Sequence, residues 1–363
     1  MIRALGLFAF ATCIVVCSAS GVAAICTPSF PYNEGWLGGD AAYSIRLSDT
    51  EAVWLFGDSF VGDPSRKTRS GSRMVSNTIA ISSCAKGSWS IRYYWRNRGA
   101  EVPQPFFTSG VERFHYWPLD GFYLSGTLYV ALAKIVHEPK DSPFGFEMIG
   151  VSLARISNPL DDPARWTVKY LDLSDSKLAF PGVTTIVSGD YVYLYAVLDD
   201  AQHKSHPMIL ARIAIKQIDR PRDSIRYLTN DGAWKAAGDL NNARIVIDRG
   251  ATEMSVRYHA SINKWIAVQN GPELFSGEIV VREAPTLEGP WSEPEPIYSF
   301  PQMSKGDPQY DRDTFCYAAK EHPEFSPPTG SMVMTYVCNS MTFQKLIENM
   351  SVYRPEVVER EMR

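Results

Sequence analysis

One strand–turn–strand pattern occurs five times along this sequence, and no other feature constrains the fold as strongly. Each copy has an alternating apolar stretch, a short polar turn and a second apolar stretch; the copies span residues 41–59, 121–136, 183–198, 254–270 and 314–340. Alternation of Tyr, Val, Ile and Trp, interrupted by Gly, Asp, Asn and Ser, is typical of antiparallel hairpins. The sequence therefore predicts an all-β protein built from five hairpins.

Further strand-like segments lie between these hairpins. MIGVSLARI and RWTVKYLDL follow the second hairpin, and GEIVVREAP and PWSEPEPIY follow the fourth. Four strands in each of five similar units is the arrangement of propeller blades, which repeat around a central axis. We therefore expect a five-bladed β-propeller with four-stranded antiparallel blades, formed by residues 25–363 as a single domain. A β-sandwich is the main alternative, but five similar units favour radial repetition.

The first residues have the features of an export signal. Arg3 gives a positive start, residues 5–16 are apolar, and residues 18–24 are mostly small, with Val22 and Ala24 suitably placed for cleavage. The apolar run is too short to span a bilayer, which favours a cleaved signal peptide, residues 1–24, over an uncleaved membrane anchor. We expect a secreted or periplasmic protein that has no membrane association after cleavage.

Four of the six cysteines follow the predicted signal peptide: Cys26, Cys84, Cys316 and Cys338. An even number in an exported protein favours disulfides over free thiols, and without a CxxC pair a zinc site has no support from spacing. Cys316 and Cys338 lie on the two arms of the fifth hairpin, where opposed positions approach closely enough to form a bridge. We therefore expect these two to pair, and Cys26 to pair with Cys84.

Charge and motif content exclude several classes of function. The formal net charge of −4 argues against nucleic acid or an anionic membrane as partner, because both require a concentrated basic surface. The sequence contains no GxSxG nucleophile elbow, HExxH zinc motif, P-loop or dinucleotide fingerprint. We therefore expect a site that uses neither a cofactor nor a metal.

Acidic residues recur where the first strand of each unit begins. In a propeller that strand lies nearest the axis, so residues at its entry line one central funnel. Asp40 stands there in the first unit, Asp120 in the second, Glu253 in the fourth, and Asp311 and Asp313 in the fifth; the third has no acid. The alternative is that these acids cap turns or backbone amides.

Carboxyl groups gathered in one cleft are what glycoside hydrolysis requires. One must donate a proton to the leaving oxygen, and another must be ionised to act as base or nucleophile. We predict Asp40, Asp120 and Glu253 as the catalytic residues. In this assignment Asp40 is ionised, Glu253 is the protonated donor, and Asp120 raises the pKa of the donor through its like charge.

Side chains suited to sugar binding flank these acids. Sugars present apolar C–H faces, so aromatic rings beside polar groups make a suitable binding floor. The predicted substrate-binding residues are Trp36, Asp58, His115, Tyr116, Trp117, Asp313 and His322. Asp58 is included because the second strand of its hairpin returns to the funnel side. Packing between blades is the alternative for the aromatic residues, and a simple turn or loop position for Asp58 and His322.

Several segments together resemble a known bacterial family of five-bladed propellers, long of unknown function, that includes endo-D-arabinanases. The resemblance rests on GWLGGDAAYSIRLSDTEAVWLFGDSFVG, GATEMSVRYHASINKWIAVQ, REAPTLEGPWSEPEPIY and YAAKEHPEF with MTYVCNS. It covers nearly all of the mature chain, and the stretch from GGD to WLFGDS is its most specific part. The resemblance implies a secreted glycoside hydrolase, with Asp40 as general base, Asp120 as the acid that tunes its partner, and Glu253 as proton donor.

These observations favour a hydrolase that cleaves a furanoside-containing or similar poly- or oligosaccharide outside the cytoplasm. Two alternatives stay open, because a fold does not determine a function. A non-catalytic carbohydrate-binding propeller would keep the aromatic residues without needing both carboxylates. A protein-interaction scaffold would use a face of the propeller to bind partners.

Overall fold

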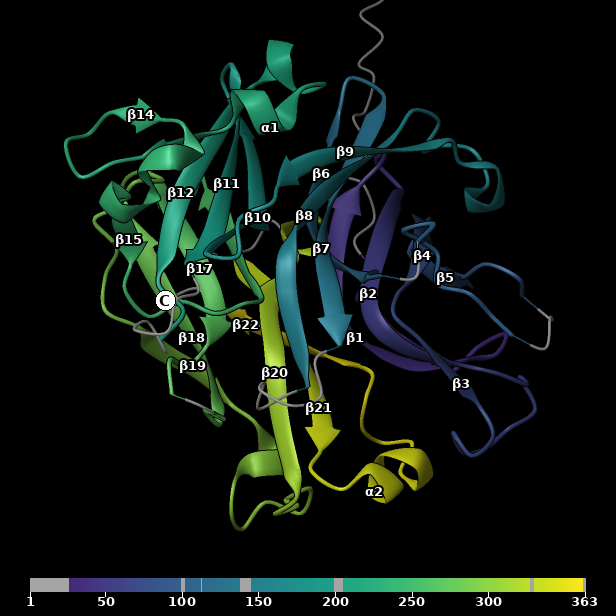
Figure 1. Ribbon diagram of the computed structural model, residues 1–363. Helices are drawn as coiled ribbons and strands as arrows, with labels where there is room; N and C mark the ends of the chain where they lie inside the picture. The colour runs from purple at the N-terminus through teal and green to yellow at the C-terminus, as the bar shows by residue number, and fades with distance from the viewer. Residues whose placement is uncertain are drawn as a thin grey trace, which may run out of the picture.

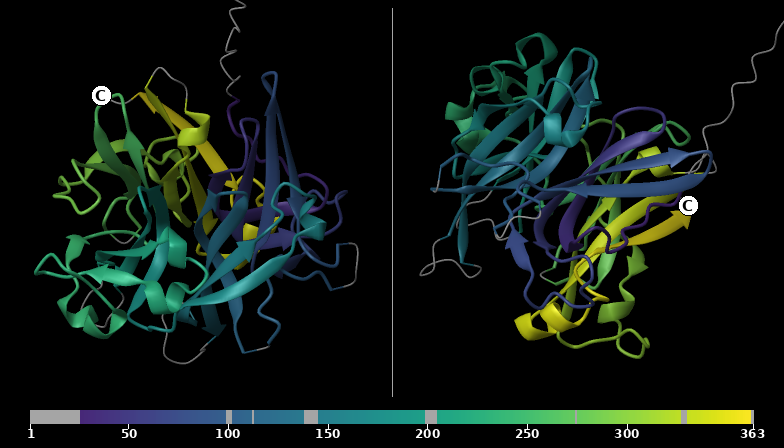
Figure 2. Two further views of the ribbon diagram at one scale, coloured as in Figure 1. Left: turned by 90° about the horizontal axis from the view of Figure 1, so that it is seen from above. Right: turned by 90° about the vertical axis from the view of Figure 1, so that its right-hand side faces the viewer.

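Five antiparallel sheets surround a common axis, with the first strand of each sheet on the inside (Figure 1). The inner strands contact one another in chain order, and the first also contacts the fifth, which closes the ring. Viewed from above, the chain passes around the centre from blade to blade in sequence order (Figure 2). The computed structural model describes residues 26–98, 102–111, 113–137, 145–198, 205–273, 275–326 and 330–361. The prediction of a five-bladed β-propeller is confirmed.

The blades differ in size, with three to six strands each in place of a uniform four. Blade one contains β1 (Trp36–Arg46), β2 (Glu51–Val61), β3 (Arg73–Val75), β4 (Thr78–Ala85) and β5 (Ser88–Tyr94). Blade two contains β6 (His115–Leu124), β7 (Thr127–His137), β8 (Phe146–Ile156) and β9 (Val168–Ser174). Blade three contains β10 (Ala179–Ser188), β11 (Tyr191–Leu198), β12 (Met208–Ala214), β13 (Arg226–Leu228), β14 (Trp234–Lys235) and β15 (Ile245–Ile247).

The last two blades follow the same inside-to-outside order. Blade four contains β16 (Met254–His259), β17 (Lys264–Asn270), β18 (Glu278–Ala284) and β19 (Glu295–Ser299). Blade five contains β20 (Thr314–Glu321), β21 (Ser331–Ser340) and β22 (Pro355–Glu361). Two short helices, α1 (Pro221–Ser224) and α2 (Phe343–Glu348), lie in connections between strands.

Alternating apolar side chains fill the space between neighbouring blades. Leu153 of β8 and Leu194 of β11, for example, belong to one buried cluster between blades two and three. Similar clusters join blades one and two, and blades three and four. Burying apolar surface stabilises each contact by roughly 25 cal/mol per Å². Period-two alternation therefore sets both the strands and the packing of one blade on the next.

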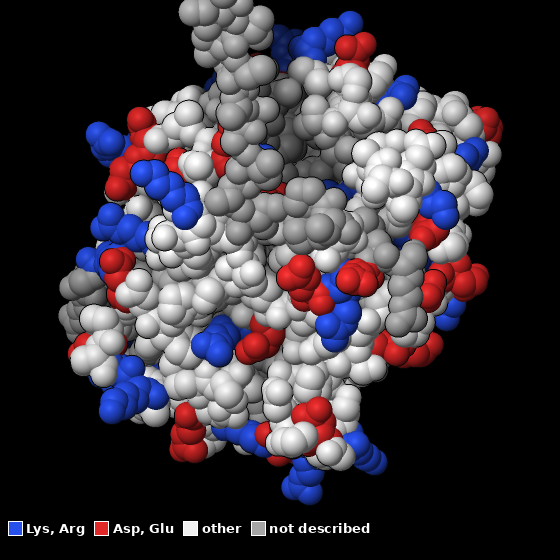
Figure 3. Space-filling view, turned by 180° about the vertical axis from the view of Figure 1, so that it is seen from behind, with Lys and Arg blue, Asp and Glu red and all other residues white. Residues whose placement is uncertain are grey.

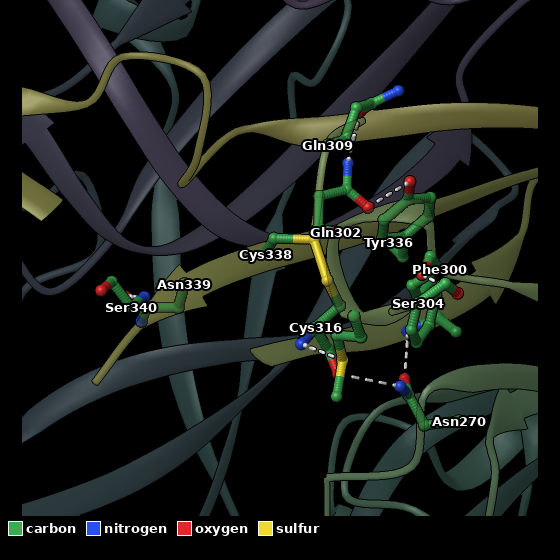
Figure 4. Close-up of a disulfide and its surroundings, with 12 residues drawn as sticks. Asn270, Phe300, Gln302, Ser304, Gln309, Cys316, Tyr336, Cys338, Asn339 and Ser340 are labelled. Atoms are coloured by element: carbon green, nitrogen blue, oxygen red, sulfur yellow. Dashed lines mark hydrogen bonds between the residues drawn. A yellow bond between two sulfur atoms is a disulfide. The ribbon is translucent and has the colours of Figure 1, made fainter. Parts of the chain in front are cut away.

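Both predicted disulfides are present. Cys26 pairs with Cys84 at a Cα–Cα distance of 5.8 Å, which ties the N-terminal segment to β4. Cys316 and Cys338 are directly opposed in the β20–β21 ladder and pair at a Cα–Cα distance of 4.0 Å (Figure 4). Asn270 of β17 lies beside this second bridge and donates from Nδ2 to the Cys316 carbonyl at 3.1 Å.

A buried arginine joins the first blade to the last. Arg69, in the loop between β2 and β3, is 0% exposed. Its guanidinium donates hydrogen bonds, at 2.6 to 3.1 Å, to the carbonyls of Leu37, Leu346, Asn349 and Val352 and to the hydroxyl of Tyr32. Within the described chain each sheet takes its strands from one continuous segment. Among these segments no strand is shared between the first and last blades, and the hydrogen bonds that Arg69 donates therefore contribute to ring closure.

A glycine permits this close approach of the two blades. A Cβ on Gly38 would lie 2.2 Å from the carbonyl oxygen of Tyr353 and 3.0 Å from Arg69 Nη2, and Gly38 has a φ of +123°. Only glycine adopts that conformation readily and leaves this space empty. Ring closure therefore explains the first glycine of the GG pair in the first unit of the sequence.

Two further features concern membranes and export. None of the helices in the described segments is long and apolar enough to cross a bilayer. The predicted signal peptide, residues 1–24, lies outside the described residues.

We predict that Arg69→Met strongly destabilises the protein. The substitution leaves several buried carbonyls without a donor, and each buried acceptor left unsatisfied typically lowers the free energy of unfolding by about 1–3 kcal/mol. Arg66→Met is the matched control, because Arg66 is exposed in the same loop and bonds only locally to Ser70. Urea denaturation measures both variants, and equal stability of the two would contradict the role of Arg69 in ring closure.

Candidate active site

Irregular strand pairing places several inner-strand side chains at the axis. In β1, β6, β10 and β20 the register with the second strand shifts, at residues 36–43, 118–121, 181–184 and 317–320. Such bulges bend a strand and re-aim its side chains, and they often adjoin active sites. Asp40, Asp120 and Lys320 lie in or beside these irregularities, and Glu253 immediately precedes β16.

The Asp40 carboxyl group lies where blade one meets blade five. Its Oδ2 accepts hydrogen bonds from the hydroxyl of Tyr317, in β20, at 2.7 Å and from the hydroxyl of Tyr353, before β22, at 3.3 Å. Burial raises the pKa of Asp40 to about 8, and the nearby charges of Asp58 and Glu253 contribute to the rise. Asp40 is therefore protonated at neutral pH.

Asp58 lies on β2, across the first hairpin from Asp40. Its Oδ1 accepts a hydrogen bond from Trp117 Nε1 at 2.9 Å. Burial raises the pKa of Asp58 to about 6, although the Trp117 bond and the charge of His137 oppose the rise. The adjacent Gly57 leaves room for Asp40, because a Cβ there would lie 2.4 Å from Asp40 Oδ1. The two carboxyl groups thus share one environment but differ in pKa.

Glu253 forms an ion pair with a buried lysine. Lys320 Nζ lies 3.4 Å from Glu253 Oε1, and the two side chains are 1% and 21% exposed. The ammonium also donates to the carbonyls of Ala41 and Ala318, the second at 2.7 Å. Both alanines have positive φ angles, 64° and 62°, a strained conformation for a residue with a Cβ. The bulges of two blades therefore present their carbonyls to Lys320, which fixes the position of Glu253.

The structure buries Asp120 below the site. Asp120 is 0% exposed, and its oxygens accept bonds from the amides of Gly121 and Thr185, each at 2.8 Å, and from the hydroxyl of Thr184 at 3.2 Å. Arg257 of β16 also approaches, with Nη2 3.4 Å from Asp120 Oδ2. With its oxygens occupied in this way, Asp120 can position Arg257 and β10 but presents no free carboxyl group to a ligand.

Two of the predicted binding residues lie beside Asp58. Trp117 donates to its carboxyl group and packs edge-on against Phe146 at 4.6 Å. His115 stacks on His137 at 4.9 Å, and burial together with the charge of His137 lowers the pKa of His115 to about 4. His115 is therefore neutral at neutral pH. These rings form one partly exposed wall of the site.

The remaining predicted contacts lie elsewhere. Trp36, Tyr116 and His322 are 0%, 4% and 1% exposed, which leaves these side chains in the core without a face for a ligand. The Trp36 ring stacks on Tyr93 at 4.2 Å, and His322 Nδ1 bonds to Ser44 Oγ at 2.6 Å. Packing, the alternative interpretation of Trp36 and Tyr116, fits their surroundings, and His322 fits its own alternative, a loop histidine with its hydrogen bonds satisfied.

Asp313 contacts α2 and its own loop, and no hydrogen bond or ion pair joins it to the carboxyl pair within the described residues. Its carboxylate lies 3.6 Å from Lys345 of α2 and 3.5 Å from Arg312, and its carbonyl accepts from the Met341 amide at 2.8 Å. These bonds hold the loop before β20 against α2. Asp313 therefore stabilises the end of blade five.

Four side chains of the site are absent from the sequence prediction: Tyr317, Lys320, Tyr353 and Arg257. The prediction considered only residues at the start of each inner strand. Tyr317, Lys320 and Arg257 lie further along an inner strand, and Tyr353 precedes the outer strand β22. For Tyr317 the sequence did contain a signal. Alternation on β20 places Tyr317 on the same face as Phe315 and opposite to the buried Cys316. No pattern in the sequence indicates that Tyr353, more than 300 residues from Asp40, bonds to it.

Charge on the outer surface is mixed. The face opposite to that of Figure 1 carries interspersed acidic and basic side chains, with no large patch of either sign (Figure 3). In the described residues, no three or more His, Cys, Asp or Glu side chains gather in a way that could hold a metal ion. The site is therefore distinguished from the rest of the described surface by the carboxyl groups of Asp40 and Asp58 and by the adjacent rings of His115 and Trp117.

Comparison with known proteins places this geometry in context. The family described as Domain of unknown function (DUF5005) matches residues 29–360. No curated protein matches the chain. A "putative hydrolase" from Bacteroides ovatus ATCC 8483 has a TM-score of 0.70 at 16% identity, over 89% of this chain and 85% of its own. At this identity the similarity shows the fold alone.

Two further solved structures, both of enzymes, show weaker structural similarity. A GH43_1 enzyme from Xanthomonas citri, complexed with xylotriose, has a TM-score of 0.48 at 12% identity, over 92% of this chain and 90% of its own. An exo-1,5-alpha-L-arabinanase from a bovine ruminal metagenomic library has a TM-score of 0.45 at 13% identity, over 92% and 96%.

We predict that replacing the titrating carboxyl group of Asp40 changes the pH dependence of stability. Its pKa of about 8 in the folded protein lies above the ordinary 3.8, so the folded state keeps a proton that the unfolded state loses. Wild-type stability should therefore fall as the pH rises from about 4 to about 8. The Tm of Asp40→Asn minus that of wild type should increase over this range, whereas for Asp58→Asn the increase should end near pH 6. A pH-independent difference for Asp40→Asn would contradict the raised pKa.

Proposed function

This chain belongs to the DUF5005 family, and we propose that it is a glycoside hydrolase that acts on a polysaccharide outside the cytoplasm. The observation that carries the proposal is the carboxyl pair at the axis. Asp40 and Asp58 share one environment, yet the pKa of Asp40 is raised to about 8 and that of Asp58 to about 6. A pair with separated pKa values is the arrangement required of an acid and a base.

Asp40 is the proton donor in this proposal. At neutral pH its carboxyl group is protonated, because burial and the charges of Asp58 and Glu253 disfavour the carboxylate. The hydroxyls of Tyr317 and Tyr353 both donate to Oδ2, so they hold the group in one orientation and leave Oδ1 to carry the proton. Asp40 then transfers that proton to the leaving glycosidic oxygen as the bond to the anomeric carbon breaks.

Asp58 is the ionised partner. It loses its proton above about pH 6, and the Trp117 indole N–H stabilises the carboxylate. In this state Asp58 serves as the base or nucleophile at the anomeric carbon. The roles differ from the assignment made from the sequence, in which Asp40 was ionised and Glu253 held the proton.

Glu253 and Asp120 act on the Asp40–Asp58 pair indirectly. Lys320 holds the Glu253 carboxylate in an ion pair, and the negative charge of Glu253 helps to keep Asp40 protonated. Asp120 holds Arg257 and the amide of Thr185, which fixes the inner strands of blades two, three and four relative to one another. Both act through other residues, so we describe them as positioning residues.

The proposed substrate is a poly- or oligosaccharide, with furanoside-containing glycans as the class to test first. The partly exposed rings of Trp117 and His115 offer apolar surface beside the carboxyl pair, as sugar binding requires. The furanoside preference rests on the sequence resemblance to the family that includes endo-D-arabinanases. Two disulfides favour an oxidising compartment, which agrees with the proposed site of action.

We predict a bell-shaped pH profile of kcat/KM for hydrolysis. The acidic limb should lie near pH 6, where Asp58 ionises, and the alkaline limb near pH 8, where Asp40 loses its proton. Asp40→Asn and Asp58→Asn should each lower kcat by about 10²–10⁴-fold. Glu253→Gln should shift the alkaline limb to lower pH, because it removes one negative charge near Asp40.

Reducing-sugar release from arabinan, arabinogalactan and xylan measures these effects. Asp172→Asn is the control, since Asp172 is an exposed outer-strand acid paired with Lys134, and it should retain wild-type activity. Near-normal turnover in both Asp40→Asn and Asp58→Asn would reject the assignment. Retention of these glycans without any turnover by the wild-type protein would indicate a carbohydrate-binding propeller instead.

Export makes a separate prediction. If residues 1–24 form a signal peptide, the mature protein begins within a few residues of Ile25. Mass spectrometry of the protein expressed in a secreting bacterial host reads this terminus directly. An intact Met1 in the mature pool would contradict cleavage.

A further inference from the structure

A row of three aromatic rings leads from the surface to the Asp40 carboxyl group. The Phe275 ring lies 5.1 Å from that of Phe315, and the Phe315 ring stacks on Tyr317 at 5.7 Å between centroids. The Tyr317 hydroxyl then donates to Asp40 at 2.7 Å. Phe275 is 41% exposed, whereas Phe315 and Tyr317 are half-buried. The row is therefore continuous with the proposed site and open at its outer end.

Strand geometry explains why two of these rings share a face. Phe315 and Tyr317 are two residues apart on β20, so their side chains point to the same side, and Cys316 between them points to the other. Cys316 lies in the core cluster that also contains Cys338. Among the described residues, that cluster includes neither Phe315 nor Phe275, so core packing does not account for their positions.

The loop that carries Phe275 is anchored to blade five at its start. Asn270, at the end of β17, donates to the Cys316 carbonyl at 3.1 Å (Figure 4). It also accepts a hydrogen bond from the Ala319 amide at 2.9 Å. These two bonds fix the start of the following loop to β20 on both sides of Tyr317. Phe275 then adopts a φ of 56°, unusual for an aromatic residue. A strained backbone that exposes a large apolar ring points to function.

We propose that Phe275, Phe315 and Tyr317 form a glycan-binding platform that holds the polymer on one side of the bond to be cleaved. The exposed Phe275 ring offers a stacking face, and the partly exposed edges of Phe315 and Tyr317 continue the apolar surface toward Asp40, so more than one sugar residue can place its apolar C–H groups along the row. The inference rests on the proposed function, and it adds that the natural substrate extends beyond the cleaved bond. The platform favours chains of several sugars over a single terminal sugar.

Two alanine variants test the platform against a matched control. In Phe315→Ala and Phe275→Ala, KM for the polysaccharide that the wild type hydrolyses fastest should rise about tenfold, and kcat should change far less. The ratio of polymer activity to activity on p-nitrophenyl α-L-arabinofuranoside should fall by a similar factor. Phe343→Ala should leave polymer kinetics unchanged, because Phe343 is 63% exposed on α2 and outside the row.

A binding measurement separates this inference from the proposed function. Affinity electrophoresis in gels containing arabinan, arabinogalactan or xylan reports retention of the wild type and of each variant without requiring turnover. Retention by the wild type that is lost in Phe315→Ala supports the platform even if no hydrolysis occurs. Two results would overturn it: wild-type retention and KM in both folded variants, or no retention of the wild type by any of the three polymers, as expected for a surface that binds protein.

Discussion

The seam between blade one and blade five is the constraint on which the rest of this structure depends. Each sheet of the described chain is built from one continuous segment, so contacts between the first and last blades close the ring in place of a shared strand. Arg69 donates to three backbone carbonyls across the seam, those of Leu346, Asn349 and Val352, and Lys320 of β20 donates to the carbonyl of Ala41 in β1. Asp40 lies in the same seam between Tyr317 and Tyr353. Closure and the proposed chemistry therefore involve one network.

Burial in that network accounts for the electrostatics of the site. Removing a carboxyl group from water disfavours its charged form, which is the largest cause of the raised pKa values of Asp40 and Asp58. The same burial lowers the pKa of Lys320, while the Glu253 carboxylate opposes the change. A seam that was more open to water would leave both acids ionised at neutral pH. The tight fit of the first and last blades thus also sets the protonation state of Asp40.

The sequence predicted the features that depend on local periodicity. Alternation in five hairpins gave the propeller, and the opposed positions of Cys316 and Cys338 gave the disulfide, because both follow from strand geometry alone. The contribution of each aromatic ring was not predictable in this way. Trp36 and Trp117 both precede an inner-strand aspartate, yet Trp36 is fully buried against Tyr93 while Trp117 reaches Asp58. The difference lies in contacts with other strands.

Near-symmetry of the blades explains why equivalent positions serve different purposes. Asp40 and Asp120 both lie at a bulge in an inner strand, but the neighbours of Asp120 supply amides and hydroxyls that occupy its oxygens. Asp40 instead meets two tyrosines and the space left by Gly57. In blade three, Thr184 lies at the bulge of the inner strand, and its hydroxyl donates to Asp120. One position repeated around a ring can therefore supply a reactive group in one blade because its neighbours supply the support.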